Sequence, residues 1–141
     1  MKKWLRQNLL YLALIQALMA TLGSLYASEV LKFAPCVLCW YQRVAMYPLI
    51  PILIVGILKK DKNLPLYVFP LAIFGALVAF YQVLLQAGFI PESATPCTFG
   101  VSCTTRYLNL LGFIDFPFLS LLSFAFIIGF VILYTRLNSK R

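Results

Sequence analysis

Two cysteines separated by two residues are the clearest sign of chemistry in this chain. Cys36 and Cys39 enclose a Val-Leu dipeptide, and Arg43 follows four residues after the second cysteine. A C-x-x-C disulfide closes a very short loop, so it stabilises a fold poorly, and this favours a redox role. Residues four apart share a helix face, so Arg43 can favour a thiolate at Cys39 or a reduced, anionic acceptor beside it. The alternative role for Arg43 is an anchor that reaches the lipid headgroups.

A second pair, Cys97 and Cys103, lies in a stretch that also contains Pro91, Pro96 and Gly100. Gly100 lets the chain turn back, so this pair can close a small disulfide ring that we expect to be exposed and mobile. The spacing alone leaves a structural disulfide and a redox pair equally open. Four cysteines can also bind zinc, but these two spacings are not those of a usual zinc ribbon, and we predict no metal site.

The composition is that of an integral membrane protein. Of the 141 residues, 62% are hydrophobic and only 11% are charged, and the mean hydropathy is +0.91. A soluble domain would be about a quarter charged. We predict one all-α domain over 1–141, a bundle of four transmembrane helices. Three uncharged stretches reach the roughly 20 residues that cross a bilayer, and the second span reaches this length when it extends back through Arg43. The predicted spans are 8–27, 39–58, 65–88 and 116–135, with outer loops at 28–38 and 89–115.

The net charge of +8 has an uneven distribution that indicates topology rather than nucleic-acid binding. In a four-span model, nine of the twelve basic residues fall on one side, and the opposite loops hold only Lys32 and Arg106. The positive-inside rule then places both termini in the cytoplasm and all four cysteines outside, where disulfides persist. The first span resembles a signal peptide, but its apolar stretch is long and Leu25 suits cleavage poorly, so we expect it to be retained.

The second span must position the C-x-x-C pair. The uncharged run 44–58 is about 22 Å long as a helix, which is short of the roughly 30 Å hydrocarbon core. The helix should therefore extend back through Arg43, with Pro35 at its first position and both cysteines in its first turn. The partial positive charge of a helix N-terminus stabilises a thiolate there.

Other residues within or near the spans carry weaker signals. Pro48 and Pro51 should kink the second helix, because each removes a backbone hydrogen bond. Gln82 and Gln86 share a face of the third span, and we expect helix–helix contacts from them rather than ligand contacts. The apolar stretch 107–114 is expected to lie in the membrane interface as a short helix.

The string Cys36-Val37-Leu38-Cys39-Trp40-Tyr41-Gln42-Arg43 resembles the signature of the disulfide-bond-formation protein B (DsbB) family. The short chain is most similar to the Gram-positive branch of that family, known as BdbC. The resemblance extends over four spans, a C-x-x-C at the start of the second span and a second pair in the second outer loop. It implies a membrane thiol oxidase that takes electrons from an extracytoplasmic thioredoxin-like partner and passes them to a quinone, with menaquinone expected from the branch.

Carried over by position, the resemblance also assigns roles. The partner's thiolate attacks Cys97, and Cys103 then exchanges with Cys36. Cys39 is left as the thiolate that meets the quinone ring, and Arg43 stabilises the developing negative charge. Two features depart from the family: the second pair is tightly spaced, and the chain has no histidine, so no histidine can deliver a proton to the quinone.

Two further functions compete with a thiol oxidase. A relative of the vitamin K epoxide reductases would use the same parts, but in that family the loop pair precedes the C-x-x-C. A small four-helix exporter would need an ionisable carboxylate within the membrane. The four acidic residues, Glu29, Asp61, Glu92 and Asp115, all lie in predicted loops or at span ends.

Overall fold

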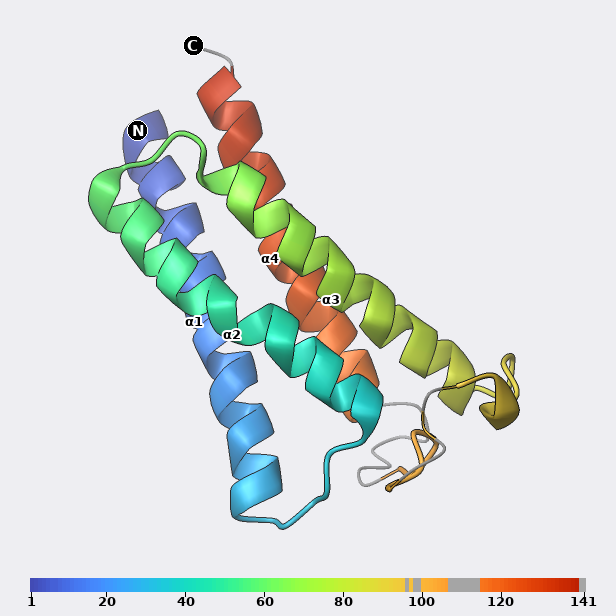
Figure 1. The fold of residues 1–141 in the computed structure, drawn as a ribbon. Coiled ribbons are helices and arrows are strands. Elements are labelled where there is room, and N and C mark those ends of the chain that lie inside the picture. Colours follow the sequence, from blue (N-terminus) through green and yellow to red (C-terminus); the bar gives the residue numbers. More distant parts are fainter. Residues whose placement is uncertain (96, 98–99, 107–114, 140–141) are drawn as a thin grey trace.

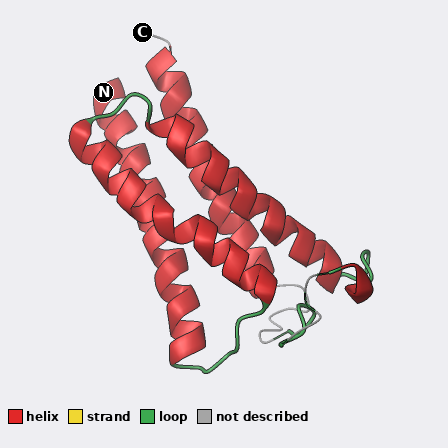
Figure 2. Ribbon diagram, in the orientation of Figure 1, coloured by secondary structure: helices red, strands yellow, loops and turns green. Residues whose placement is uncertain are grey.

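The computed structural model describes residues 1–95, 97, 100–106 and 115–139, which form four long helices and one short 3-10 helix (Figure 1). No strand occurs in this part of the chain (Figure 2). The short interfacial helix expected over 107–114 lies outside the described residues. The elements are α1 at Lys2–Glu29, α2 at Val37–Lys59, α3 at Leu64–Gln86, η1 at Glu92–Ala94 and α4 at Phe116–Ser139.

All four long helices are long and apolar enough to cross a membrane, which confirms the predicted all-α, four-helix membrane bundle. α1 packs against α2 and α4, and α3 packs against the same two helices. Figure 1 shows both chain termini at one end of the bundle, together with the turn between α2 and α3. We call this the terminal end. The α1–α2 loop and the segment after α3 lie at the opposite end, which we call the cysteine end.

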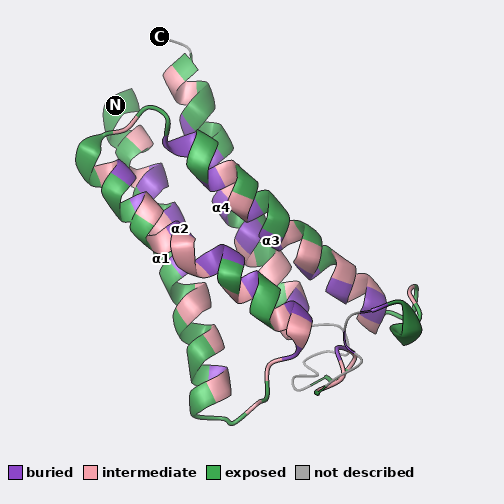
Figure 3. Ribbon diagram, viewed as in Figure 1, coloured by how far each residue is buried: buried purple, intermediate pink, exposed green. Residues whose placement is uncertain are grey.

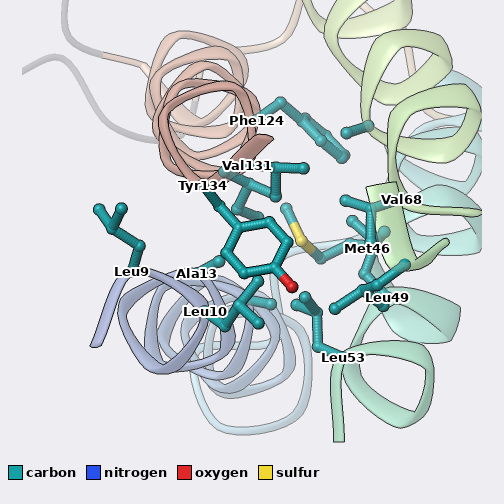
Figure 4. Close-up of a cluster of buried hydrophobic side chains, with 14 of the residues drawn as sticks. Leu9, Leu10, Ala13, Met46, Leu49, Leu53, Val68, Phe124, Val131 and Tyr134 are labelled. Atoms are coloured by element: carbon teal, nitrogen blue, oxygen red, sulfur yellow. The ribbon is translucent and has the colours of Figure 1, made fainter. Parts of the chain in front are cut away.

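The helices pack through a core that all four supply. Side chains such as Leu10 of α1, Leu49 of α2, Val68 of α3 and Val131 of α4 converge in it (Figure 4). The ring of Phe124 lies directly against Gly75, where any Cβ would overlap it. Small residues at helix contacts allow this close approach in membrane bundles. Among the described residues, five alanines within the helices are completely buried: Ala13, Ala17, Ala45, Ala72 and Ala79.

The outer faces of the bundle are apolar as well. Leu22, Leu58, Leu77 and Phe126 are large hydrophobic side chains that are more than half exposed. Figure 3 shows exposed and buried positions side by side on each helix. Exposed side chains of this kind suit lipid, because the hydrocarbon core of a bilayer is as apolar as they are.

α2 departs from a straight helix. It changes direction near its middle in Figure 1, and Pro48 and Pro51 stand inside it. The kink predicted from these prolines is therefore confirmed. Its cause is the backbone hydrogen bond that each proline removes.

Candidate redox site

The C-x-x-C pair stands at the N-terminus of α2. Cys36 is the N-cap residue, and its Sγ accepts a hydrogen bond from the backbone N–H of Cys39 at 3.3 Å. The two thiols are free and contact each other, with their Sγ atoms 2.8 Å apart. The prediction that Pro35 occupies the first helical position is wrong, because the helix begins at Val37. A capping interaction from the Cys36 sulfur replaces the expected proline start, and only Cys39 lies within the first turn.

Gln82 of α3 joins the thiol pair to a buried amide network. Its Nε2 lies 3.2 Å from Cys36 Sγ and 3.6 Å from Cys39 Sγ, and the side chain is only 2% exposed. Its Oε1 accepts a hydrogen bond from Gln42 Nε2 at 2.6 Å. The expected helix–helix contact is therefore present. The contact with the sulfurs was missed, although Gln82 lies one turn from the cysteine end of α3, at a depth similar to that of Cys39 in α2.

The environment of Cys36 favours its protonated form. The hydrogen bond with the Cys39 thiol raises the pKa of Cys36 well above its usual value, and burial raises it further. A thiol that shares a hydrogen bond with a neighbouring sulfur stabilises negative charge on that neighbour. Cys36 is therefore the member of the pair that keeps its proton.

Arg43 turns from α2 towards α1. Its Nε donates to Ser24 Oγ, and its Nη2 donates to the Ser24 carbonyl oxygen and to Ser28 Oγ, each at 2.9 Å. Its guanidinium carbon also lies 5.3 Å from the centre of the Trp40 ring, within the range of a cation–π contact. Arg43 is thus held by α1 and by its own helix. Residue spacing does not reveal the two serines as its partners, because they lie in a different span.

A cavity of about 340 Å³ opens beside these residues at the cysteine end of the bundle. Its size falls within the roughly 300–1,000 Å³ typical of small-molecule sites. Cys36, Cys39 and Arg43 all line it, so the structure brings these three predicted site residues together. Further polar residues of its wall come from α1, α2, α3 and the segment before α4: Thr21, Ser24, Tyr47, Gln82 and Asp115.

Asp115 is a buried acid that the sequence placed only near a span end. Its side chain is 7% exposed, and its Oδ2 lies 3.5 Å from Nε of Arg106. Arg106 also donates from Nη2 to the carbonyl oxygen of Gln86 at 2.7 Å. The segment that follows the second cysteine pair is thereby joined to the end of α3 and to the start of α4.

The second pair forms a disulfide between Cys97 and Cys103. Gly100 adopts a φ of 91° within the ring, a conformation that glycine accepts without strain. The expectation of an exposed ring is wrong for its two cysteines, since Cys97 is 8% exposed and Cys103 is 1% exposed, whereas Gly100 at the turn is exposed. The cause is packing: both cysteines belong to one buried cluster with Cys36, Leu38 and Leu85.

Among the residues that the structure describes, no group of three or more histidine, cysteine or acidic side chains could hold a metal ion. The described site consists of two neighbouring cysteine pairs and a cavity whose wall is partly apolar and partly polar.

Comparison with known proteins matches residues 6–134 to the family model described as "Disulfide bond formation protein DsbB". The chain belongs to the DsbB family. It is 45% identical over 138 residues to "Probable disulfide formation protein C 2" of Bacillus cereus, covering 98% of this chain and 99% of that protein. It is 47% identical to "Disulfide bond formation protein C" of Bacillus subtilis, covering 88% of this chain and 90% of that protein. No solved structure gives a significant match.

Membership of the DsbB family confirms the resemblance drawn from the C-x-x-C-x-x-x-R string, and the Bacillus relatives confirm the BdbC-like branch. The chain is a multi-pass membrane protein with a disulfide oxidoreductase role in disulfide-bond formation. This finding favours disulfide formation over the two competing functions, a vitamin K epoxide reductase-like enzyme and a small exporter.

Proposed function

We propose that this DsbB-family protein is a quinone-dependent thiol oxidase of the bacterial cytoplasmic membrane. It reoxidises an extracytoplasmic thioredoxin-like partner and passes the electrons through two cysteine pairs to a membrane quinone, with menaquinone as the expected acceptor. One observation carries the proposal: the Cys36–Cys39 thiols line a cavity and pack in the same cluster as the Cys97–Cys103 disulfide. A dithiol between a disulfide and a cavity has an exchange partner on one side and room for an acceptor on the other.

The loop pair is the proposed entry point for electrons. A partner thiolate attacks Cys97 Sγ, forms a mixed disulfide and releases Cys103 as the thiolate. The partner's second thiolate then attacks the partner's first sulfur, which releases Cys97 as a thiolate and the partner as a disulfide. The exposed fractions support attack at Cys97, because this residue is less deeply buried than Cys103. The partner loses two electrons in this step, and the loop pair gains them as two thiols.

The second exchange moves the electrons to α2. Cys103 attacks the Cys36 sulfur of an oxidised Cys36–Cys39 pair, and Cys97 completes the exchange by re-forming the loop disulfide. The common buried cluster makes this transfer short, since Cys36 and Cys103 pack within it together.

The last step oxidises the α2 pair at the cavity. Cys39 carries the negative charge that reacts with quinone, while Cys36 closes the disulfide. Two thiols become one disulfide and release two electrons and two protons, which equals what a quinone needs to become a hydroquinone. The overall balance therefore needs no histidine. Arg43 lines the same cavity and would stabilise the negative charge that develops on the quinone oxygen beside it.

A quinone is chemically suited to this place. A strongly oxidising protein partner needs a still stronger terminal acceptor, and about 30 mV corresponds to 1.4 kcal/mol for two electrons. The cavity wall is largely apolar with a few polar groups, which suits a flat ring that carries two carbonyl oxygens. For the topology, we propose cytoplasmic termini and an extracytoplasmic cysteine end, on the strength of the basic residues at the terminal end.

Purified protein mixed with a reduced thioredoxin-like dithiol protein and a short-chain menaquinone tests the proposal. We expect one quinone to be reduced for each partner disulfide formed. Quinone absorbance measures the first quantity, and alkylation of the remaining partner thiols measures the second. Partner oxidation without quinone reduction would contradict the proposed acceptor. A failure of both reactions, with several such partners and quinones, would contradict the thiol oxidase itself.

A further inference from the structure

Buried polar atoms without a partner gather at one place in the bundle. Among the described residues, four buried side-chain nitrogen or oxygen atoms have no hydrogen-bond partner, and three of them belong to residues that line the cavity. An unsatisfied buried polar group costs about 1–3 kcal/mol, so native proteins rarely keep one without a use. The three are Thr21 Oγ1, Tyr47 OH and Asp115 Oδ1.

Thr21 of α1 and Tyr47 of α2 line the same cavity and lie at a similar depth in the bundle. The hydrogen bond from Arg43 to Ser24 fixes the register between α2 and α1. α1 runs towards the cysteine end and α2 runs away from it (Figure 1). Thr21 lies three residues before Ser24 and Tyr47 four residues after Arg43, so both lie about one turn deeper than this contact. The two hydroxyls therefore mark the inner part of the cavity, and Cys39 marks the outer part.

One stripe of α2 connects the two parts. Cys39, Arg43 and Tyr47 are spaced four residues apart, so they follow one another along the same face, and all three line the cavity. The distance from Cys39 to Tyr47 along the helix is about 12 Å. A flat ring spans only part of this distance. Placed over the turn from Arg43 to Tyr47, it would have one edge beside Arg43, on the side of Cys39, and its opposite edge near Tyr47.

Other hydroxyls in these helices behave differently. Ser28 donates to the carbonyl oxygen of Ser24, Ser123 donates to that of Leu119, and Thr135 donates to that of Val131. This local bond is the usual way in which a helix satisfies a buried serine or threonine. Thr21 does not make it within the part of the chain that the structure describes, and its hydroxyl is left to a group from outside its own helix.

We propose that Thr21 and Tyr47 are quinone-binding residues whose hydroxyls donate hydrogen bonds to the carbonyl oxygen farther from Cys39. This inference rests on the proposed quinone-dependent function and extends it to a second end of the ring. A para-quinone carries its two oxygens on opposite edges, and both gain negative charge as electrons arrive from Cys39. Arg43 serves the near oxygen, and the two hydroxyls serve the far one. Donors aimed at a developing charge stabilise the transition state more than the ground state.

The test uses two variants that remove only a hydroxyl or replace it isosterically, Tyr47→Phe and Thr21→Val. The matched control is Tyr11→Phe, because Tyr11 lies on the outer face of α1, is 47% exposed and does not line the cavity. Turnover is measured with short-chain menaquinone and, separately, with short-chain ubiquinone. Partner exchange is measured in a single turnover without quinone, and stability is measured by thermal unfolding in detergent.

We expect Tyr47→Phe and Thr21→Val each to lower kcat/KM for quinone by about 10-fold, as the loss of one hydrogen bond to a charged group would. Partner exchange should be unchanged, and unfolding temperatures should not fall, since no bond within the protein is lost. Tyr11→Phe should match the wild type in every assay.

Unchanged quinone kinetics in both variants, with an active wild type, would overturn this inference and leave the thiol oxidase intact. An equal loss of quinone turnover and partner exchange would also overturn it, because it would indicate a general structural role. A wild type that reduces neither quinone would contradict the proposed function itself, which separates the two failures.

Discussion

Cys36 and Cys39 belong to a helix end, whereas Cys97 and Cys103 belong to a loop, and the fold holds the two pairs in different ways. The helical pair is fixed by the first turn of α2 and by Gln82 of α3, which contacts both sulfurs. The loop disulfide lies in a segment secured by a few contacts, such as the hydrogen bond from Gln86 to the Cys103 carbonyl oxygen at 3.5 Å. A pair on a rigid helix suits a bound ring, and a pair on a loop suits a protein partner that must reach it.

The two pairs nevertheless form one buried unit. Cys36, Cys97 and Cys103 pack together with Leu38 and Leu85, so the loop pair is held against the helical pair. The two pairs have different supports but lie in one buried cluster. One small bundle can therefore assign two parts of a reaction to two different cysteine pairs. One pair can be specialised for a small acceptor and the other for exchange, while three of the four cysteines are buried in one cluster.

The largest expected effect comes from breaking the helical pair. Cys39→Ser should abolish quinone reduction, because a serine oxygen cannot form the disulfide that releases electrons to the acceptor. Quinone absorbance during turnover measures this result. Full quinone-dependent turnover in a folded Cys39→Ser protein would show that the helical pair is not the site of quinone reduction.

Breaking the loop pair should have a different outcome, the accumulation of an intermediate. In Cys103→Ser the lone Cys97 thiolate can attack the disulfide of an oxidised partner, which forms a mixed disulfide and releases the partner's second thiolate. Cys103 is absent and cannot resolve this bond, so a covalent complex with oxidised partner should appear on a non-reducing gel. Cys97→Ser is the matched variant and should not trap the partner. The reverse pattern would mean that Cys103 is attacked first.

Arg43→Ala should weaken the reaction with quinone and leave thiol exchange with the partner protein unchanged. The loss of a charge-assisted interaction corresponds to about 1.5–3 kcal/mol, so quinone kcat/KM should fall about 10- to 100-fold. Ser28→Ala is the control, since it removes one anchor of Arg43 and keeps the charge. A larger effect of Arg43→Ala on partner exchange than on quinone use would refute the proposed role.

Gln82→Met tests how Gln82 supports the helical pair. The substitution keeps the side-chain volume but leaves Gln42 without its buried acceptor, so the free energy of unfolding should fall by about 1–3 kcal/mol. Gln42→Met removes only the amide pair and leaves the contact between Gln82 and the sulfurs. Thermal unfolding measures stability, and a change in thiol alkylation rate in Gln82→Met alone would isolate the sulfur contact.

The smallest expected effect concerns the protonation of Cys36. Its hydrogen bond with Cys39 raises the pKa of the Cys36 thiol, so less thiolate is present at a given pH than in an ordinary cysteine. Cys39→Ala removes that bond and should lower the pKa, which would make alkylation of Cys36 faster at pH 8 and move its pH profile to lower pH. An unchanged profile would mean that burial alone governs this thiol.

Much of the architecture follows from local features of the sequence. Hydropathy over 20-residue stretches predicts four helices, because each span is apolar along its own length, and Pro48 and Pro51 predict the bend in α2. The start of α2 was predicted less well: the Cys36 sulfur caps a helix that begins at Val37, and a sequence pattern that favours Pro35 at the first position does not reveal this cap.

The site depends more on contacts between helices. Gln82 reaches the sulfurs and Arg43 reaches Ser24 only because α3 and α1 pack against α2 in one register. The burial of the loop disulfide has the same origin, since Leu38 and Leu85 cover it from two helices. Periodicity and spacing describe one segment at a time, so they do not reveal which side chains of different spans meet.

The sequence by itself determined the class of this protein: an all-α membrane bundle with a C-x-x-C at a helix start, a second cysteine pair and a signature of the DsbB family. Composition and short motifs suffice for this, because membrane insertion and thiol chemistry depend on local residue types. Only the tertiary structure decided that the two pairs share one buried cluster and that Cys39, Arg43 and Tyr47 line one cavity. Those relations arise from packing between helices far apart in the chain, which close approach at residues such as Gly75 makes possible.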